Sequence, residues 1–336
     1  MEQHSVIVHS LQWADVLLKD FLPRVKEWGY DGVELGCRGD HFDPHKALES
    51  DRYVRDKLDL LEQNGLRCLA LSDHLTGACV CDYVDDRYRP LVPARVWGDG
   101  KPEGVSGRAA EEMKRLAAAA SALGVPVVVS LTGSKIWRDW YPFPPRPKGA
   151  VERGFDDFAE RWLPILDAYR DMGVKLAIEV HAAQIAYDIL TAERAVKAVD
   201  NHLSFGFNLD PSHLVYQFVN PVRFVEALAD RIFHVHIKDA RLNLDGRRSI
   251  LSSHLDWGES MRGWDFVSPG RGDVKWDLLI RALNQSGYSG PLSVEAEDAL
   301  IDRDYVAREA LEMIRKVDYV PSTMGQDDAW ASSGLE

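Results

Sequence analysis

The sequence is short of cysteine, of positive charge and of long apolar runs. Four cysteines in 336 residues are too few for a disulfide framework, so we expect reduced thiols. The formal net charge of −13 argues against a nucleic-acid or anionic-membrane partner, because both require a basic face. No apolar run approaches the ~20 residues that span a bilayer, and residues 1–5 lack the basic-then-apolar pattern of a signal peptide. Together these absences predict a cytoplasmic protein.

Short apolar runs alternate with segments of helical periodicity along most of the chain. The runs predict eight strands, at Val6–His9, Gly32–Gly36, Leu66–Leu71, Pro126–Leu131, Leu176–His181, Phe205–Leu209, Ile232–Ile237 and Pro291–Glu295. The periodic segments predict helices at Trp13–Trp28, Tyr53–Gln63, Arg108–Leu123, Phe155–Met172, Thr191–Val199, Pro221–Ala229, Trp276–Ser286 and Tyr305–Val317. This alternation predicts an α/β protein, a single (β/α)8 TIM barrel with long active-site rim loops.

Three irregular segments interrupt the alternation and are predicted to lie at the rim of the barrel: residues 82–107, 137–147 and 240–272. No linker-like change in composition divides the chain, so we predict one catalytic barrel domain over residues 1–320. Residues 321–336 are rich in Ser, Gly and Asp and are predicted to form a flexible tail or to contact another subunit, with Trp330 as an anchor.

Side chains that bind metals occur at the ends of four consecutive predicted strands: Glu179, Asp210, His236 and Glu295. The carboxyl ends of barrel strands meet at one mouth, where catalytic groups collect. Each residue alone could be a salt-bridge partner, but four at consecutive strand ends favour one metal site. Three carboxylates and an imidazole suit Mn²⁺, Mg²⁺ or Co²⁺ better than a structural zinc, which would recruit cysteine. The metal would also relieve the mutual repulsion of the carboxylates.

Three further histidines lie close to these positions in the sequence. His213 follows Asp210 across Pro211 and could contact substrate oxygen or carry protons, or simply cap a helix. His181 points to the same side of its strand as Glu179, so we consider it an acid/base candidate or a core histidine. His234 shares a face with His236 but sits deeper, which favours a hydrogen-bonded supporting role.

Four other polar residues are candidates for weaker reasons. Lys238 and Arg241 could bind an anionic or hydroxylated substrate, although surface salt bridges explain them equally well. His74, at the end of the third predicted strand, could donate to a sugar hydroxyl. Glu34 lies inside the second predicted strand, and we interpret it as structural.

Several motifs resemble the xylose-isomerase-like TIM-barrel superfamily of sugar isomerases and epimerases. They are Gly29-Tyr-Asp-Gly-Val-Glu-Leu, Ile178-Glu-Val-His, Leu209-Asp-Pro-Ser-His, His234-Val-His-Ile-Lys-Asp, Gly270-Arg-Gly-Asp-Val-Lys-Trp and Leu292-Ser-Val-Glu. Each motif is weak alone, but their order and spacing together cover most of the chain, from about Val6 to Val317.

The resemblance implies that Glu179, Asp210, His236 and Glu295 bind one divalent metal, usually Mn²⁺. It implies that Glu179 and Glu295 move the proton on either side of an enediolate that the metal stabilises, and that His213 contacts the substrate. The implied function is a sugar isomerase or epimerase that removes a proton α to the carbonyl of a keto-sugar. We expect a homo-oligomer, with association with a second, different subunit as an alternative.

The chain departs from the ketose 3-epimerases of this superfamily at two positions. Those enzymes carry a Glu where this chain has Ile185, and an Arg where it has Leu242 beside Arg241. These departures argue against a simple monosaccharide 3-epimerase. In length the chain resembles the α subunits of C-glycoside deglycosidases, lyases that cleave 3-keto-glycosides by β-elimination. Several tryptophans would suit an aromatic aglycone or equally a subunit interface, namely Trp97, Trp137, Trp140, Trp257 and Trp264.

Two other functions are weighed against these. The trinuclear-zinc AP endonucleases share the Asp-Pro-Ser-His element, but they need further histidines and a basic DNA-binding face, whereas the fourth strand here ends in Leu131-Thr132-Gly133 and the chain is acidic. A non-catalytic barrel scaffold is the alternative from a different class. The sequence leaves open the identity and stereochemistry of the substrate and the choice between isomerisation and elimination.

Overall fold

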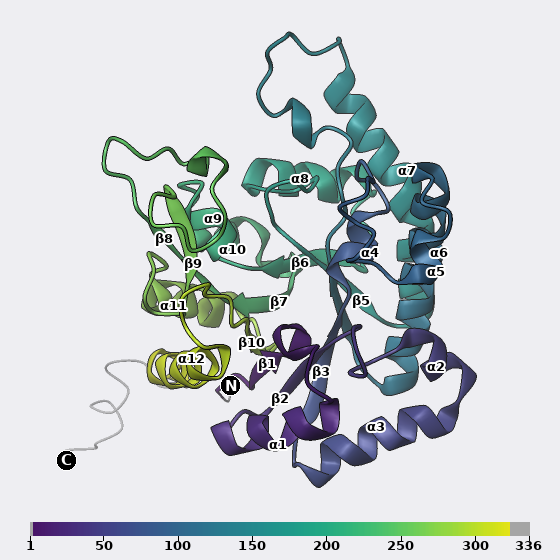
Figure 1. The fold of residues 1–336 in the computed structure, drawn as a ribbon, viewed down its shortest axis with the longest axis vertical. Helices are drawn as coiled ribbons and strands as arrows, with labels where there is room; N and C mark the ends of the chain where they lie inside the picture. Colours follow the sequence, from purple (N-terminus) through teal and green to yellow (C-terminus); the bar gives the residue numbers. More distant parts are fainter. Residues whose placement is uncertain (1–2, 323–336) are drawn as a thin grey trace, which may run out of the picture.

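Eight parallel strands form a closed barrel at the centre of the molecule, in a computed structural model that describes residues 3–322 (Figure 1). The strands are β1 (Val6–His9), β2 (Gly32–Gly36), β3 (Arg67–Ser72), β4 (Val127–Ser130), β5 (Lys175–Glu179), β6 (Phe205–Leu209), β7 (Ile232–Ile237) and β10 (Leu292–Val294). The barrel closes where β1 pairs with β10, with Val6 opposite Leu292. The prediction of a (β/α)8 TIM barrel is therefore confirmed.

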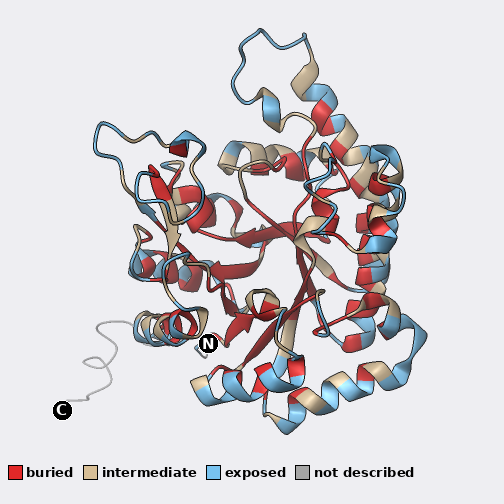
Figure 2. Cartoon of the chain, viewed as in Figure 1, coloured by how far each residue is buried: buried red, intermediate tan, exposed pale blue. Residues whose placement is uncertain are grey.

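Helices surround the barrel, and the bounds of the longer ones are α1 (Leu18–Trp28), α2 (Pro44–Glu49), α3 (Asp51–Gln63), α6 (Pro102–Leu123), α7 (Ala150–Asp171), α8 (Ile189–Ala198), α10 (Pro221–Leu228), α11 (Trp276–Ser286) and α12 (Arg303–Val317). The short helical segments α4 (His74–Ala78) and α9 (Ser212–Val215) directly follow β3 and β6, and α5 (Ala94–Trp97) lies between α4 and α6. The helices bury their apolar stripes against the strands and expose their polar faces, as the burial colours show (Figure 2).

Local sequence accounts for where several helices begin and end. The Ser50 side chain accepts a hydrogen bond from the Tyr53 N–H at the start of α3, and Asp188 and Thr191 form a capping box at the start of α8. Gly29 ends α1 in the left-handed region, with φ of 95°, which glycine adopts without a steric penalty.

Two of the segments expected to be irregular contain regular structure. Helix α6 begins at Pro102, six residues before the predicted start, because proline is well suited to the first helical turn. The third insertion contains an antiparallel pair, β8 (Asp239–Leu242) and β9 (Trp264–Val267). The second segment projects beyond the barrel as the loop between β4 and α7, with one short 3-10 turn (Figure 1).

The β8–β9 pair is anchored by the buried carboxylate of Asp239. Its two oxygens accept hydrogen bonds from Trp276 Nε1 and from four backbone N–H groups, including that of Gly272. A Cβ atom on Gly272 would lie 2.1 Å from Asp239 Oδ1, so only glycine fits this approach. The rim insertion is thus fixed to the barrel by the residue that directly follows Lys238.

Several sequence expectations concern features other than the barrel. All four cysteines are free thiols. None of the helices in residues 3–322 combines the length and the apolarity that crossing a bilayer requires. The predicted anchor Trp330 and residues 323–336 of the predicted tail lie outside the described part of the chain.

Candidate active site

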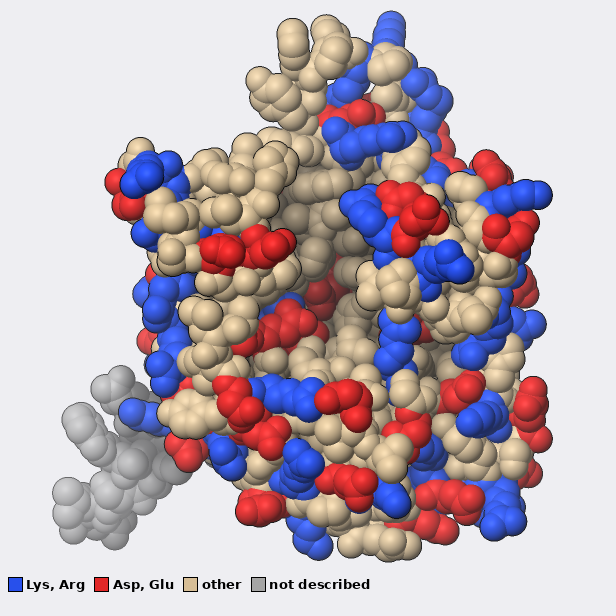
Figure 3. All heavy atoms as spheres, viewed as in Figure 1, with Lys and Arg blue, Asp and Glu red and all other residues tan. Residues whose placement is uncertain are grey.

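A cavity of about 540 Å³ opens at the carboxyl ends of the barrel strands. Six of the predicted site residues line it: His74, Glu179, His181, His213, Lys238 and Glu295. The space-filling view shows a central hollow with acidic side chains, drawn red, on its floor (Figure 3). The position is the one where the loops of parallel barrels collect functional groups.

The four predicted metal ligands converge at this mouth. Glu179 ends β5, Asp210 follows β6, His236 lies in β7 and Glu295 follows β10. One donor atom from each lies within 4.8 Å of the others, and all four residues are buried. Four donors this close, three of them carboxylates, form a group that could hold one divalent cation.

Two donor atoms of this group lack a hydrogen-bond partner among the described residues. These buried atoms are Asp210 Oδ2 and His236 Nδ1. His236 Nδ1 lies 3.1 Å from Glu179 Oε2 and 3.4 Å from Glu295 Oε2, without hydrogen-bond geometry. A buried polar atom without a partner is costly, so these orphaned atoms fit a cation between the carboxylates and the imidazole.

Glu34 lies beneath the four-residue group and contacts one of its members. Its Oε2 accepts hydrogen bonds from His236 Nε2 at 3.1 Å, from His234 Nε2 at 2.8 Å and from Ser293 Oγ at 2.8 Å. Burial acts to raise the pKa of Glu34, but the nearby charges of His9, His236 and His234 outweigh it and hold the pKa well below its usual range. A carboxylate that binds Nε2–H leaves Nδ1 as the free donor atom, directed toward Glu179 and Glu295.

Two supporting residues escaped the sequence analysis. His9, at the end of β1, bridges Ser72 Oγ through Nε2 at 2.7 Å and Glu295 Oε1 through Nδ1 at 3.0 Å. Asn208 Nδ2 donates to Glu179 Oε2 at 3.0 Å. The signal that could have identified both is the alternation of side chains along a strand. Each is a polar residue that points into the barrel from a strand predicted to be wholly buried.

Lys238 places a buried ammonium at the edge of the cluster. Its Nζ lies 3.0 Å from Glu295 Oε2, 3.5 Å from Asp210 Oδ2 and 2.9 Å from Glu297 Oε2. Burial acts to lower the pKa of Lys238, but the charges of Glu295, Glu297 and Asp210 outweigh it, so the pKa lies well above its usual value. The group is therefore a positively charged hydrogen-bond donor. Glu297, which closes this contact from the solvent side, was not identified from the sequence.

The imidazole rings of His213 and His181 contact each other, with centroids 4.0 Å apart and ring planes tilted by 50°. His213 Nε2 lies 3.0 Å from Glu179 Oε1 and 3.3 Å from Asp210 Oδ2. Burial opposes its protonation, but the charge of Asp210 outweighs burial, and the pKa of His213 rises to about 9. Burial and the charge of His213 lower the pKa of His181 to about 3. The pair thus combines a proton donor with a neutral imidazole.

The rim insertion supplies an aromatic wall to the cavity. Phe266 and Trp257 line it and stack with centroids 5.0 Å apart. Lys238 Nζ lies 4.4 Å from the Phe266 centroid, and the Arg262 guanidinium lies 4.0 Å from the Trp257 centroid. These contacts between cations and aromatic rings connect the Lys238 ammonium in the site to the rim insertion.

Two predicted substrate-binding residues lie outside this cavity. Arg241 is exposed on β8 and donates to the backbone carbonyl of Arg271. Trp137 lines two other cavities, and its ring packs edge-on against Tyr187 in the one that Tyr187 also lines. Whether a rim residue points into the mouth depends on the path of its loop. Sequence periodicity does not determine that path. His234 occupies the supporting position that its depth in β7 predicted.

Comparison with known proteins gives one family and several relatives. A family model described as xylose isomerase-like TIM barrel matches residues 22–317. The chain is 28% identical over 214 residues to the uncharacterized protein YfiH of Bacillus subtilis (strain 168), covering 59% of this chain and 67% of that protein. It is 28% identical over 127 residues to an inosose dehydratase of Clostridium botulinum (strain Alaska E43 / Type E3), covering 38% of this chain and 42% of that enzyme. The second match spans less than half the length of the relative.

A solved structure extends the comparison over nearly the whole chain. The 3-keto-D-glucoside 4-epimerase YcjR from E. coli, in its apo form, superposes with a TM-score of 0.65 at 15% sequence identity. The superposition covers 94% of this chain and 100% of that one. At this level of identity the likeness shows the fold alone.

Proposed function

Because this chain belongs to the xylose isomerase-like TIM barrel family, we propose that it is a divalent-metal-dependent enzyme that removes a proton α to the carbonyl of a keto-sugar or cyclic keto-polyol. The observation that carries the proposal is the convergence of Glu179, Asp210, His236 and Glu295, with donor atoms within 4.8 Å of one another. These residues would hold the metal, Mn²⁺ first and Mg²⁺ or Co²⁺ as alternatives, since oxygen donors dominate. A bound divalent ion supplies polarisation of the substrate's carbonyl and hydroxyl oxygens.

In this proposal two carboxylates move the proton. Glu179 and Glu295 come from different sides of the mouth, and both line the cavity. In the proposed step, one carboxylate oxygen takes the proton from the carbon next to the carbonyl. The C–H electron pair becomes the C=C bond of an enediolate, and the π pair of the carbonyl moves onto its oxygen. Return of a proton to the other face of that carbon inverts its configuration. His181 is the weaker candidate base, because a pKa of about 3 leaves it neutral but poorly able to hold a proton.

Charged donors beside these carboxylates hold substrate oxygens in position. Lys238 Nζ and His213 Nε2 lie 3.0 Å from Glu295 Oε2 and from Glu179 Oε1 respectively, so both donors reach the space that the reacting carbons would occupy. His74 Nε2, at 3.5 Å from Glu179 Oε2, has no hydrogen-bond partner among the described residues and could donate to a hydroxyl.

A dehydratase or glycoside lyase is the second candidate, and Lys238 favours it. Elimination needs an acid at the leaving oxygen: the Cβ–O bond breaks as the C=C bond forms, and the departing oxygen takes a proton from the ammonium. Ile185, at a position where the 3-epimerases carry Glu, is buried, and Leu242 packs against the apolar cluster around Trp264. The name of the inosose dehydratase relative describes a reaction of this elimination class.

The test is metal-dependent proton exchange in D₂O from a panel of keto-sugars, keto-inositols and 3-keto-glycosides, followed by NMR. Deuterium incorporation with a new epimer or ketose supports the isomerase, and loss of water or of an aglycone supports the lyase. Glu295→Gln and Asp210→Asn should abolish exchange, whereas Glu111→Gln, which removes an exposed carboxylate paired with Lys114, should not. Full exchange in Asp210→Asn, or none in the wild type with any of the three metals, would reject the proposal.

The alternative from a different class is a non-catalytic barrel scaffold, which predicts that Glu179→Gln leaves metal content and function unchanged. Metal content and proton exchange measured on this variant test that alternative. A homo-oligomeric state, a second subunit and a cytoplasmic location remain parts of the proposal, and each can be checked on the purified native protein.

A further inference from the structure

A proline-rich arm, residues 135–149, joins β4 to α7 and projects beyond the barrel (Figure 1). Every residue from position 140 to position 148 is exposed, as the burial colours show (Figure 2). Trp140, Tyr141 and Phe143 are 50%, 63% and 75% exposed. Single exposed apolar side chains are common, but a contiguous group of aromatic residues at the tip of a projecting segment marks an interaction surface.

Four prolines restrict the tip of the arm: Pro142, Pro144, Pro145 and Pro147. Each proline fixes its own φ angle and limits the conformations of the residue before it. A segment that is already restricted in this way loses little further conformational entropy when it binds. The exposed aromatic residues therefore lie on a segment that can dock at a low entropic cost.

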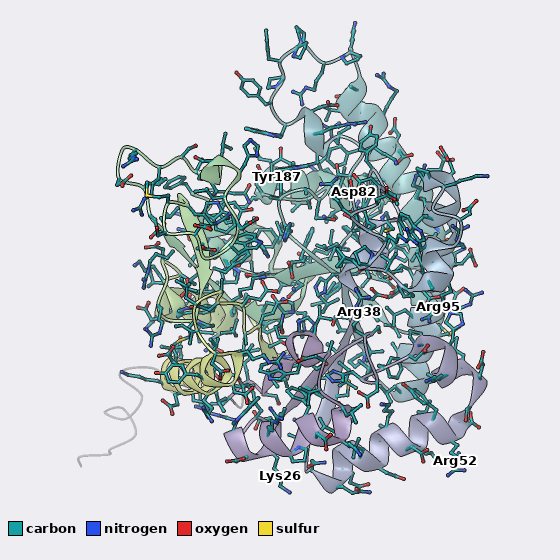
Figure 4. The ribbon with its side chains drawn as sticks, in the orientation of Figure 1. Lys26, Arg38, Arg52, Asp82, Arg95 and Tyr187 are labelled. Carbon is teal, nitrogen blue, oxygen red and sulfur yellow. The ribbon has the colours of Figure 1, made fainter. Side chains whose placement is uncertain are left out.

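An apolar recess of about 420 Å³ lies at the root of the arm. Its lining comes from the arm, from α7, from α8 and from the segment that precedes α8, and its apolar members are Ile136, Trp137, Trp140, Val151, Phe155, Ile185, Tyr187 and Leu190. Tyr187, whose ring packs edge-on against Trp137, is labelled in Figure 4. Leu190 is 75% exposed, so the apolar surface continues from the recess to the outside of the molecule.

The tip of the arm does not line the recess at its own root. Trp140 and Arg146 line the recess, whereas Tyr141 and Phe143, which lie between them in the sequence, do not. The chain therefore carries an exposed aromatic tip and, beside it, an open apolar recess. A surface that carries both halves of a contact is self-complementary, which is the property of an interface between two copies related by a twofold axis.

The charge of the arm also favours a second copy as the occupant. The arm has a formal charge of +3 in a chain of −13, because the single carboxylate of Asp139 faces four cations, namely Lys135, Arg138, Arg146 and Lys148. A cationic arm on an anionic molecule is attracted to another copy of the same molecule.

Acidic residues border the recess on α7. Glu152, Asp156 and Glu160 are exposed at intervals of four residues, so they form one acidic stripe along the helix. The stripe begins at Glu152, which lines the recess and also contacts Arg194 of its own chain at 3.5 Å. An arm that enters the recess from outside therefore brings its cations to an acidic border.

We propose that the arm of one copy of this chain docks in the recess of a second copy, reciprocally, to form a twofold-symmetric homodimer. Tyr141 and Phe143 fill the recess of the other copy, and Lys148 lies along its acidic stripe. The inference rests on the homo-oligomeric part of the proposed function, to which it assigns a surface, and is independent of the chemistry at the barrel mouth.

Sedimentation equilibrium on the full-length protein measures the dimer and its Kd. Phe143→Asp in the tip and Leu190→Asp at the recess should each raise the Kd roughly 100-fold, because a symmetric dimer contains every change twice. Leu203→Asp is the matched control, since Leu203 is 74% exposed, lies just before β6 and lines no part of the recess. Its Kd should equal that of the wild type, and thermal unfolding verifies that all three variants are folded.

A second pair of variants tests the charge of the arm. Lys148→Glu should raise the Kd roughly tenfold. Arg52→Glu makes the same change in charge on α3, where Arg52 is exposed and lies far from Tyr187 (Figure 4), and should leave the Kd unchanged. Equal Kd values for the two variants would show that the cations of the arm do not contact the other copy.

Cross-linking locates the contact. The photoreactive residue p-benzoylphenylalanine replaces Phe143 in an equal mixture of unlabelled and ¹⁵N-labelled chains. Cross-linked peptides that pair an unlabelled arm with a labelled α7 or α8, and the reverse, are expected from the reciprocal dimer.

Three results would overturn the inference: a monomer at every concentration measured, a dimer whose Kd is unchanged in Phe143→Asp, or cross-links confined to one chain. The last result would mean that the arm folds back on its own barrel. None of these measurements uses substrate or metal, so their failure is distinct from a failure of the proposed chemistry, which is read from proton exchange alone.

Discussion

Glu34 Oε2 lies 3.1 Å from His236 Nε2, although the two residues are 202 positions apart in the chain. They belong to β2 and β7, which do not pair with each other, and they meet because both side chains point into a closed barrel. The contact leaves His236 Nδ1 directed at Glu179 and Glu295. Glu34 was interpreted from the sequence as structural, and its position makes it the residue that sets the orientation of a proposed metal ligand.

Replacing Glu34 by Gln should weaken metal binding roughly 10- to 100-fold, because the amide cannot act as an anionic acceptor for the His236 Nε2–H. Calorimetric titration of the metal-free protein with Mn²⁺ measures the change. The control is Glu112→Gln, which removes a buried carboxylate that contacts His45 and Arg95 and does not line the catalytic cavity. Equal metal affinity in the Glu34 variant and the wild type would show that Glu34 does not support the site.

Removing divalent metal should lower the thermal stability of the wild type. Three buried carboxylates then repel one another, and the contribution of a bound ligand is lost, about 2.7 kcal/mol at a metal concentration of 100 times Kd. Scanning calorimetry with and without a chelator measures the shift in Tm. Asp210→Asn should abolish the metal-dependent part of the shift, and an identical Tm with and without chelator in the wild type would contradict the expectation.

Lys238→Met should reduce elimination more than proton exchange, because the ammonium is proposed to protonate the leaving oxygen. A general acid contributes roughly 10²- to 10⁴-fold, so product release should fall by that order while deuterium incorporation falls less. NMR of the same samples gives both rates. Lys114→Met, which removes a partly exposed lysine paired with Glu111, serves as the control. A parallel loss of both rates would place Lys238 in substrate binding only.

His4 should make the stability depend on pH through its contact with Asp318. His4 Nδ1 lies 3.0 Å from Asp318 Oδ1, and Nε2 lies 3.1 Å from the Tyr288 carbonyl oxygen. Burial acts to lower the pKa of His4, but the hydrogen bond to Asp318 and its charge outweigh burial and raise the pKa above 6.5. The stabilisation is therefore fully present below about pH 6.5 and is lost as the pH rises through the raised value.

His4→Gln should accordingly cost about 1.5–3 kcal/mol of unfolding free energy at pH 5.5, and less at pH 9.5. Urea unfolding at the two pH values measures the difference. Asp318→Asn should show the same dependence, and the double variant should add little further loss. A cost that is the same at both pH values would mean that the imidazole is not charged in the folded protein.

The order of the elements and the positions of the four proposed ligands were predictable from the sequence because both depend on local signals. A buried strand followed by a turn has a recognisable composition, and the carboxyl ends of parallel strands must share one mouth. Glu179, Asp210, His236 and Glu295 could therefore be grouped without knowledge of the three-dimensional path. The β8–β9 pair and the start of α6 at Pro102 were missed because polar, Pro-rich and Gly-rich segments give no clear periodicity.

Only the tertiary structure decided which residues hydrogen-bond to those proposed ligands and which cavity each rim residue lines. His9 reaches Glu295 only because β1 pairs with β10, a contact across 286 positions that no local pattern encodes. Glu297 contacts Lys238, and Trp137 lines a neighbouring cavity instead of the catalytic one. Both outcomes depend on the paths of long loops, which are fixed by packing and by anchors such as Asp239. Local periodicity determined the barrel and the positions of the four proposed ligands, whereas the long-range closure of the barrel determined which residues support them.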